Sequence, residues 1–164
     1  MKKIILTAMT ALTLATPTLA QDKKPFTGAY VGAEVGVMDS EFYYGGLLGY
    51  RKQTNNDWVW GLEGNVGKYD IGDLEGLDAS LTEYGASAIF GKAMGKGLLF
   101  ATGGVNILDA KVLNVSESDT GFKVGGGYEY KFNSRLSARA KGEYVNHGSG
   151  NDDIKGTFSI IFNF

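Results

Sequence analysis

The chain has 164 residues, with 16 Lys or Arg against 18 Asp or Glu, a formal net charge of −2 at pH 7. It contains no Cys, which excludes disulfides and thiolate metal or redox sites, and it lacks the basic surplus that nucleic-acid binding requires. With 25 Gly, 2 Pro, 9 Tyr and 9 Phe, the composition favours β structure, and the length fits a single domain.

Residues 1–20 have the pattern of a signal peptide. Lys2 and Lys3 precede an apolar stretch over residues 4–14, and Thr18-Leu19-Ala20 is a small-x-small cleavage pattern. The apolar stretch is too short to cross a bilayer as a helix, and no later stretch could do so either. We expect export and cleavage before Gln21, which would leave 14 basic and 18 acidic side chains, a formal charge of −4.

After a short N-terminal extension at residues 21–25, eight segments alternate in character with the period of a strand. In the last segment Ile154, Phe158 and Ile160 lie on one face, Lys155 and Ser159 on the other. The segments span residues 26–37, 42–52, 58–69, 82–91, 98–108, 120–130, 135–145 and 154–164. Eight strands of about ten residues suit a small transmembrane barrel. We therefore predict an all-β fold, an eight-stranded antiparallel up-and-down transmembrane β-barrel over residues 26–164.

A soluble β-sandwich or lipocalin would also alternate, but the predicted connections favour a membrane. Those at residues 53–57, 92–97 and 131–135 are short, whereas those at 69–80, 108–119 and 146–153 are longer and acidic. Short periplasmic turns and longer extracellular loops are typical of outer-membrane barrels. The first loop, residues 38–41, is short.

Aromatic side chains on the apolar face fall near the two predicted rims, with mostly aliphatic residues between them. Amphipathic rings prefer the membrane–water interface, so two such belts indicate lipid on the outside. The predicted periplasmic belt contains Tyr50, Trp58, Trp60, Phe90, Tyr128, Tyr130, Phe162 and Phe164. The predicted outer belt contains Tyr44, Tyr84, Phe122 and Tyr144.

The chain resembles the small eight-stranded outer-membrane barrels of the OmpA/OmpX-like "porin family", common in alphaproteobacteria. The resemblance is carried by residues 27–32 (TGAYVG), 61–64 (GLEG), 101–105 (ATGGV), 125–130 (GGGYEY) and 143–144 (EY), followed by a final strand that ends on Phe164. It implies location in the outer membrane, contact with its lipids and lipopolysaccharide, and delivery by the barrel-assembly machinery through the strand ending in Phe164. We expect a monomer. Ser87 and Ile89 stand where the family pattern suggests inward arginines.

The polar face becomes the barrel lumen. It carries five acidic and five basic side chains: Glu34, Glu63, Glu83, Glu129 and Glu143, with Arg51, Lys123, Arg139, Lys141 and Lys155. An eight-stranded interior is barely wide enough for its side chains, and a confined charge is costly unless paired. We expect an ion-pair network that plugs the lumen; the alternative is a narrow, solvated water column. A general diffusion porin is excluded, because such porins have about 16 to 18 strands.

Catalytic and metal sites are not predicted. The single histidine, His147, forms a His-x-Ser pair with Ser149 that is reminiscent of outer-membrane lipid A deacylases and phospholipases, but the surrounding Gly, Ser and Asn are typical of a turn. The acidic loops could share divalent cations with lipopolysaccharide phosphates. However, Asp73, Glu75 and Asp78 lack the spacing of an EF-hand, so we expect no bound metal or cofactor.

Three function classes follow from these observations. The first is a non-enzymatic outer-membrane barrel that contributes to envelope integrity and interacts at the surface through its acidic loops. The second is a narrow channel for ions or very small solutes. The third is a lipid A-modifying enzyme that uses His147 and Ser149.

Overall fold

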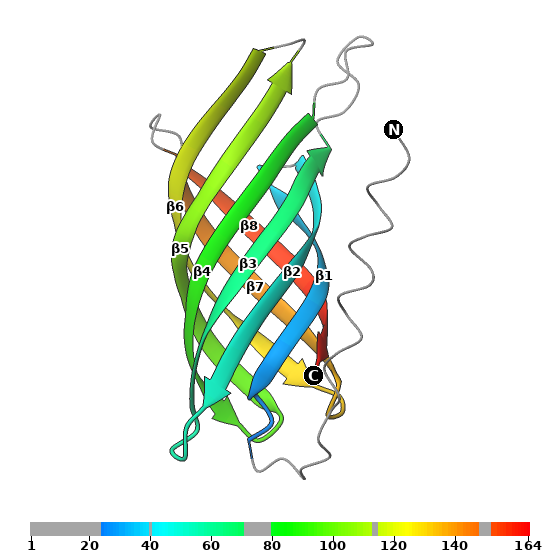
Figure 1. Ribbon diagram of the computed structural model, residues 1–164, viewed down its shortest axis with the longest axis vertical. Helices are drawn as coiled ribbons and strands as arrows, with labels where there is room; N and C mark the ends of the chain where they lie inside the picture. Colours follow the sequence, from blue (N-terminus) through cyan, green and yellow to red (C-terminus); the bar gives the residue numbers. More distant parts are fainter. Residues whose placement is uncertain (1–23, 40, 71–79, 113–114, 148–151) are drawn as a thin grey trace.

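A computed structural model describes residues 24–39, 41–70, 80–112, 115–147 and 152–164. The strands are β1 (Gly28–Met38), β2 (Glu41–Gln53), β3 (Trp58–Asp70), β4 (Ser80–Met94), β5 (Gly97–Val112), β6 (Val115–Lys131), β7 (Leu136–His147) and β8 (Asp152–Asn163). Each strand pairs antiparallel with the next, and β1 also pairs with β8, so the sheet closes into a barrel (Figure 1). The predicted fold is confirmed. Across the described segments, no helix is long and apolar enough to cross a membrane.

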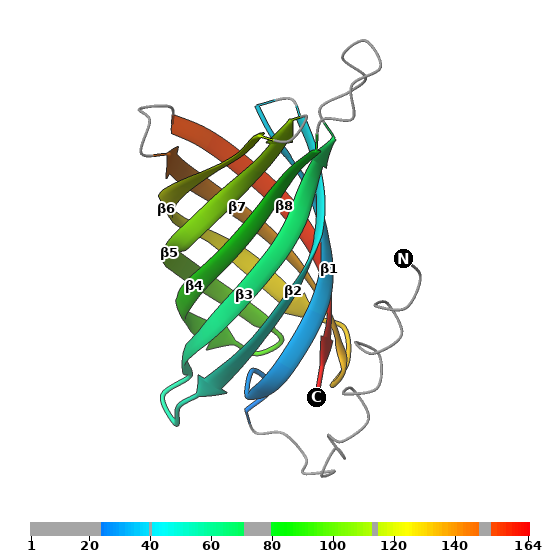
Figure 2. The same ribbon diagram turned by 45° about the horizontal axis from the view of Figure 1, so that its top comes forward.

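The strands are strongly tilted, and the front and back walls of the barrel cross in Figure 2. Three turns (54–57, 95–96 and 132–135) lie at the end of the barrel that carries the start of β1 and the C-terminus (Figure 1). We call this the turn end. The opposite end, where Met38 at the end of β1 pairs with Glu41 at the start of β2, is called the loop end. The closed ladder leaves every strand paired on both sides over most of its length, which satisfies the backbone without solvent.

Along the described strands, side chains alternate between the interior and the outer wall. In β8 the even-numbered residues from Ile154 to Phe162 are exposed, except Gly156, while Lys155, Thr157, Ser159 and Ile161 are buried. The outer wall is therefore apolar and the interior mainly polar. This arrangement reverses that of a soluble protein.

The third connection differs from the sequence prediction. Residues 108–119 do not form a long loop, because β5 continues to Val112 and β6 begins at Val115, with these two valines opposite each other. In this extended ladder, Asp109 lies opposite Ser118, and Glu117 opposite Ala110. In Figure 1 this hairpin rises beyond the other strands at the loop end.

The first strand begins at Gly28 rather than at residue 26. Gly28 has a φ of +130°, a conformation that side-chain-bearing residues rarely adopt, and an added Cβ would lie 2.6 Å from the carbonyl oxygen of Phe164. This turn directs Phe26 out of the ladder and into the barrel, where its side chain is fully buried.

Candidate functional site

The barrel interior contains an ionic layer near the turn end, centred on Glu129. Arg51 donates two hydrogen bonds to this carboxylate, of 2.6 and 2.8 Å, while Arg139 donates two of 3.0 and 3.1 Å and Ser137 one of 2.6 Å. Arg51 also donates to Asn163 Oδ1 at 2.6 Å. Five donors on one buried carboxylate compensate for the loss of its hydration.

The same layer extends upward through Arg139. Its guanidinium also pairs with Glu63, which accepts a hydrogen bond of 2.9 Å from the Tyr30 hydroxyl. Lys141 lies 3.7 Å from Glu63 and 3.0 Å from Glu143. Three carboxylates and three cations are thus joined in one connected network, which we call the lower ionic layer: Glu63, Glu129, Glu143, Arg51, Arg139 and Lys141.

A second network lies nearer the loop end and is centred on Glu83. Lys155 contacts both carboxylate oxygens of Glu83 at 2.9 and 3.0 Å, Lys123 lies at 3.9 Å, and Tyr69 and Asn65 also donate to it. We call this set, with Lys123 and Glu34, the upper ionic layer.

Glu34 joins the upper layer through a tyrosine. The Tyr43 hydroxyl donates to Glu34 at 2.6 Å and accepts from Asn65 at 3.4 Å, and the Lys155 ammonium lies 3.3 Å from the Tyr43 ring centroid. The upper layer therefore holds two carboxylates and two ammonium groups. Each layer is balanced in formal charge, and no ion pair between described side chains links one layer to the other.

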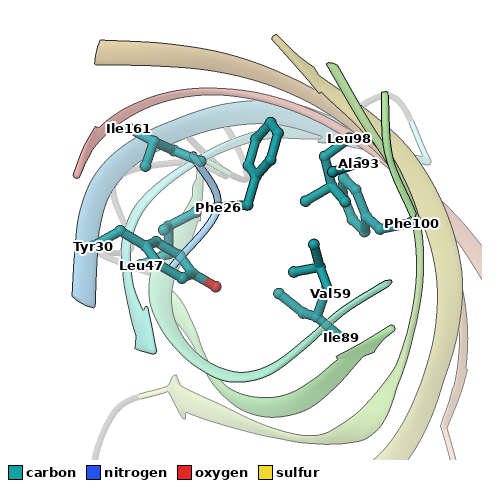
Figure 3. Packing of buried hydrophobic residues seen from close by; sticks show 9 residues of the cluster. All are labelled: Phe26, Tyr30, Leu47, Val59, Ile89, Ala93, Leu98, Phe100 and Ile161. Carbon is teal, nitrogen blue, oxygen red and sulfur yellow. The ribbon is translucent and has the colours of Figure 1, made fainter. Parts of the chain in front are cut away.

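An apolar cluster lies inside the barrel at the turn end. Figure 3 shows its nine side chains pointing into the space enclosed by the strands, with the Phe26 ring among them. The cluster consists of Phe26, Tyr30, Leu47, Val59, Ile89, Ala93, Leu98, Phe100 and Ile161. Phe26 is held by a hydrogen bond from its backbone N–H to Gln53 Oε1 at 3.1 Å and by the Arg51 guanidinium 5.0 Å from its ring centroid. A second apolar cluster at the loop end joins Met38, Tyr43 and Tyr69 with the partly buried Leu81 and Leu108.

These clusters add apolar side chains to a lumen that was predicted from its charged residues. At both ends, inward positions hold apolar side chains that pack against one another and against the charged layers. An apolar residue at an inward position interrupts the alternation of polar and apolar residues along its strand. Alternation alone therefore gives little indication of whether that residue points inward or outward. Ser87 and Ile89, which stand in place of the expected arginines, both point inward and are buried.

All ten charged residues predicted to line the lumen are buried in the interior, each at most 6% exposed. The roles of their uncharged partners were not predicted from the sequence. Tyr30, Tyr43 and Tyr69 supply hydroxyl donors to carboxylates, and Asn65 bridges Lys123 and Glu83. The sequence signal that could have identified them was their position. Along each strand these hydroxyl and amide side chains are on the same face as the charged residues, so they are expected to point into the lumen.

Several buried polar atoms have no hydrogen-bond partner among the described residues. They include one carboxylate oxygen of Glu34, the hydroxyls of Thr157 and Ser159, and both side-chain polar atoms of Asn106. Glu34 and Ser159 are neighbours in the β1–β8 ladder.

The aromatic side chains predicted for the membrane interface all lie on the outer wall, each between 36% and 56% exposed: Tyr44, Tyr50, Trp58, Trp60, Tyr84, Phe90, Phe122, Tyr128, Tyr130, Tyr144, Phe162 and Phe164. Phe42, Phe132 and Phe158 are exposed there too. Trp58 stacks on Phe90 and Phe162 contacts Phe164 edge-on.

The remaining predicted positions lie largely outside the described part of the chain. Ser149 is outside it, as are Asp73, Glu75 and Asp78; for His147, only the backbone at the end of β7 is described. Within the described segments, no three His, Cys, Asp or Glu side chains are grouped so that they could hold a metal ion.

A closed eight-stranded barrel with an apolar outer wall, aromatic side chains along it and a charged, filled interior defines a transmembrane β-barrel protein. Residues 5–163 match the family model described as "Outer membrane protein beta-barrel domain". The chain belongs to this family and is an outer-membrane β-barrel protein. No curated protein matches it significantly in sequence.

Solved structures show the same fold at low sequence identity. The N-terminal β-barrel domain of Pseudomonas aeruginosa OprF is 20% identical, with a TM-score of 0.62 over 83% of this chain and 96% of that chain. Ail, the attachment invasion locus protein of Yersinia pestis, is 19% identical, with a TM-score of 0.59 over 84% and 99%. The outer membrane enzyme PagL is 13% identical, with a TM-score of 0.57 over 82% and 99%.

Proposed function

We propose that this protein is a closed, non-conducting outer-membrane barrel that contributes to envelope integrity. The observation that carries the proposal is the filled lumen: Arg51, Glu129 and Arg139 cross the interior at no more than 1% exposure each. A solute would have to break a charge-balanced network in which each partner is buried. Breaking such a pair leaves an uncompensated charge, at a cost of about 3–5 kcal/mol.

The two apolar clusters add to this seal. Below the lower ionic layer, Phe26 fills the turn end, and above the upper layer Tyr43 and Tyr69 pack against Met38. An ion would therefore meet an apolar constriction at each end as well as the layers between them. If the protein is instead a narrow channel, these side chains must move together to let an ion pass. A conductance measurement would detect the resulting current.

The loop end is the part of the barrel that would face lipopolysaccharide and the exterior. Asp39, Glu41, Asp109, Asp152 and Asp153 give its described residues an acidic character. Short turns are typical of the periplasmic side, which supports placing the turn end in the periplasm. We propose that the acidic loops contribute surface interactions, that the leader is cleaved before Gln21, and that the assembly machinery recognises the strand ending in Phe164.

We assign no catalytic role to His147 and Ser149. The likeness to PagL is a likeness of fold, and function belongs to sites rather than to folds. The absence of a catalytic role is tested by incubating the refolded barrel with lipid A and following acyl-chain release by mass spectrometry. Release that is lost in His147→Ala would assign an enzymatic function instead.

The proposed role in envelope integrity is tested in a strain that lacks the gene and is complemented with the wild-type chain or with Arg139→Ala. We expect loss of the protein to increase entry of a dye that an intact outer membrane excludes, and wild type to restore exclusion. Equal dye entry with and without the protein would contradict a role in envelope integrity.

A further inference from the structure

Both tryptophans of the chain lie side by side on the outer wall at the turn end. Trp58 and Trp60 are 42% and 50% exposed on the same face of β3. The register places Lys52 of β2 opposite Trp60 and Lys92 of β4 opposite Trp58, and both lysines are exposed. Residues that are opposite each other in a ladder share a face, so these four side chains form one outward patch, here called the Trp–Lys patch.

The patch has a defined internal geometry. The Lys92 ammonium lies 5.6 Å from the Trp58 ring centroid, and Trp58 stacks on Phe90 at 4.9 Å with an interplanar angle of 16°. Lys52 and Lys92 occupy the strands on either side of β3, roughly 10 Å apart across the sheet and offset by the two residues between Trp60 and Trp58 along β3. Their side chains therefore flank the tryptophan pair on both sides.

Neither lysine is neutralised by the described part of the protein. Lys52 and Lys92 form no ion pair there, and the carboxylate in the adjoining turn, Asp57, accepts a hydrogen bond of 2.9 Å from Gln53. Lys24, Lys96 and Arg135 add further positive charge at this end, whereas the described loop end is acidic. The patch thus combines interfacial rings with uncompensated cations.

We propose that the Trp–Lys patch binds the phosphodiester headgroup of an anionic phospholipid in the adjacent membrane leaflet. Tryptophan rings settle at the headgroup level, which sets the patch at the depth of the lipid phosphates. The two ammonium groups donate to the phosphate oxygens, and the indole N–H groups are further donors. A zwitterionic lipid brings its own cationic group toward the lysines, so a net negative headgroup is preferred.

The location of the tryptophans makes the proposal directly measurable. The chain has no tryptophan outside the patch, so its indole fluorescence reports the lipids there. The mature barrel is refolded into phosphatidylcholine vesicles in which a fixed fraction of lipid carries brominated acyl chains, either as phosphatidylglycerol or as phosphatidylcholine. Bromine quenches indole on contact. We expect brominated phosphatidylglycerol to be enriched about fivefold at the patch, and less at high salt.

Three variants identify the source of any preference. Lys52→Gln/Lys92→Gln should reduce the enrichment to about onefold, and Lys52→Arg/Lys92→Arg should retain it. Lys68→Gln removes an exposed charge from the same strand as the tryptophans, but toward the loop end, and should leave the enrichment unchanged. A heat-dependent shift on a gel confirms that each variant is folded. Equal quenching by the two brominated lipids in wild type, or an undiminished preference in Lys52→Gln/Lys92→Gln, would overturn the proposal.

Discussion

Arg51 of β2 and Glu129 of β6 meet inside the barrel through two hydrogen bonds of 2.6 and 2.8 Å, although 78 residues separate them in sequence. The pair joins opposite sides of the closed sheet. A bidentate guanidinium–carboxylate contact fixes both distance and orientation, so it ties the two walls together in one geometry.

Arg139→Ala should strongly destabilise the barrel. The substitution leaves Glu63 and Glu129 without a shared cation in the interior, at a cost of about 3–5 kcal/mol in the free energy of unfolding. Urea unfolding in lipid vesicles, followed by tryptophan fluorescence, measures the loss. Arg135→Ala is a matched control in an exposed turn and should change stability by less than about 0.5 kcal/mol. Equal effects of the two substitutions would refute the network.

The two ionic layers should behave independently. Arg51 and Arg139 share Glu129, so the double Ala substitution should depart from the sum of the single effects by at least about 1 kcal/mol. Arg51 and Lys155 belong to different layers, and their effects should add within about 0.5 kcal/mol. Strong coupling between Arg51 and Lys155 would show that the layers form one unit.

Gly67→Ala should destabilise the barrel through Tyr43. An added Cβ at Gly67 would overlap the Tyr43 ring, whose hydroxyl donates to Glu34. Displacing a packed ring should cost about 1–3 kcal/mol. Gly142→Ala, where nothing lies within 4 Å of the added Cβ, provides the control and should be close to neutral. A neutral Gly67→Ala would mean that Tyr43 has room to move.

Phe26 should limit access of water to the lumen from the turn end. Because the chain has no Cys, Ala93→Cys places a single thiol in the apolar cluster that contains Phe26. We expect Phe26→Ala to raise its labelling rate by a small thiol reagent about tenfold or more, since proximity of water controls thiolate formation. Lys96→Cys, in an exposed turn, should label equally fast in both backgrounds. An unchanged rate at Ala93→Cys would remove Phe26 from the seal.

Strand alternation predicted the number and order of the strands because one face meets lipid and the other a filled lumen, and this contrast persists along each strand. Alternation was less informative wherever the two faces of a strand carry similar residues. At Asp109 and Glu117, polar residues suit either strand or loop, so the β5–β6 hairpin was predicted too short. At the turn end, Leu98 and Ile161 point inward despite being apolar.

The partners of the charged residues could not be read from the sequence for a different reason. Alternation along β6 places Glu129 in the lumen. Whether it meets Arg51, Arg139 or Lys155 depends on the tilt of the strands and the closure of the barrel, which bring distant strands together. Tyr30 shows the same limit, because only the closed barrel brings its hydroxyl to Glu63.

Single-channel recording in a planar lipid bilayer tests the central claim most directly. With wild-type barrel inserted, as shown by protease protection of the same sample, a sealed lumen predicts a flat current under applied voltage in either direction. Phe26→Ala/Arg139→Ala, which removes one side chain from the apolar cluster and one from the lower ionic layer, should produce measurable leak. Regular, reproducible conductance steps from the wild-type protein would contradict a sealed lumen and identify it as a narrow channel.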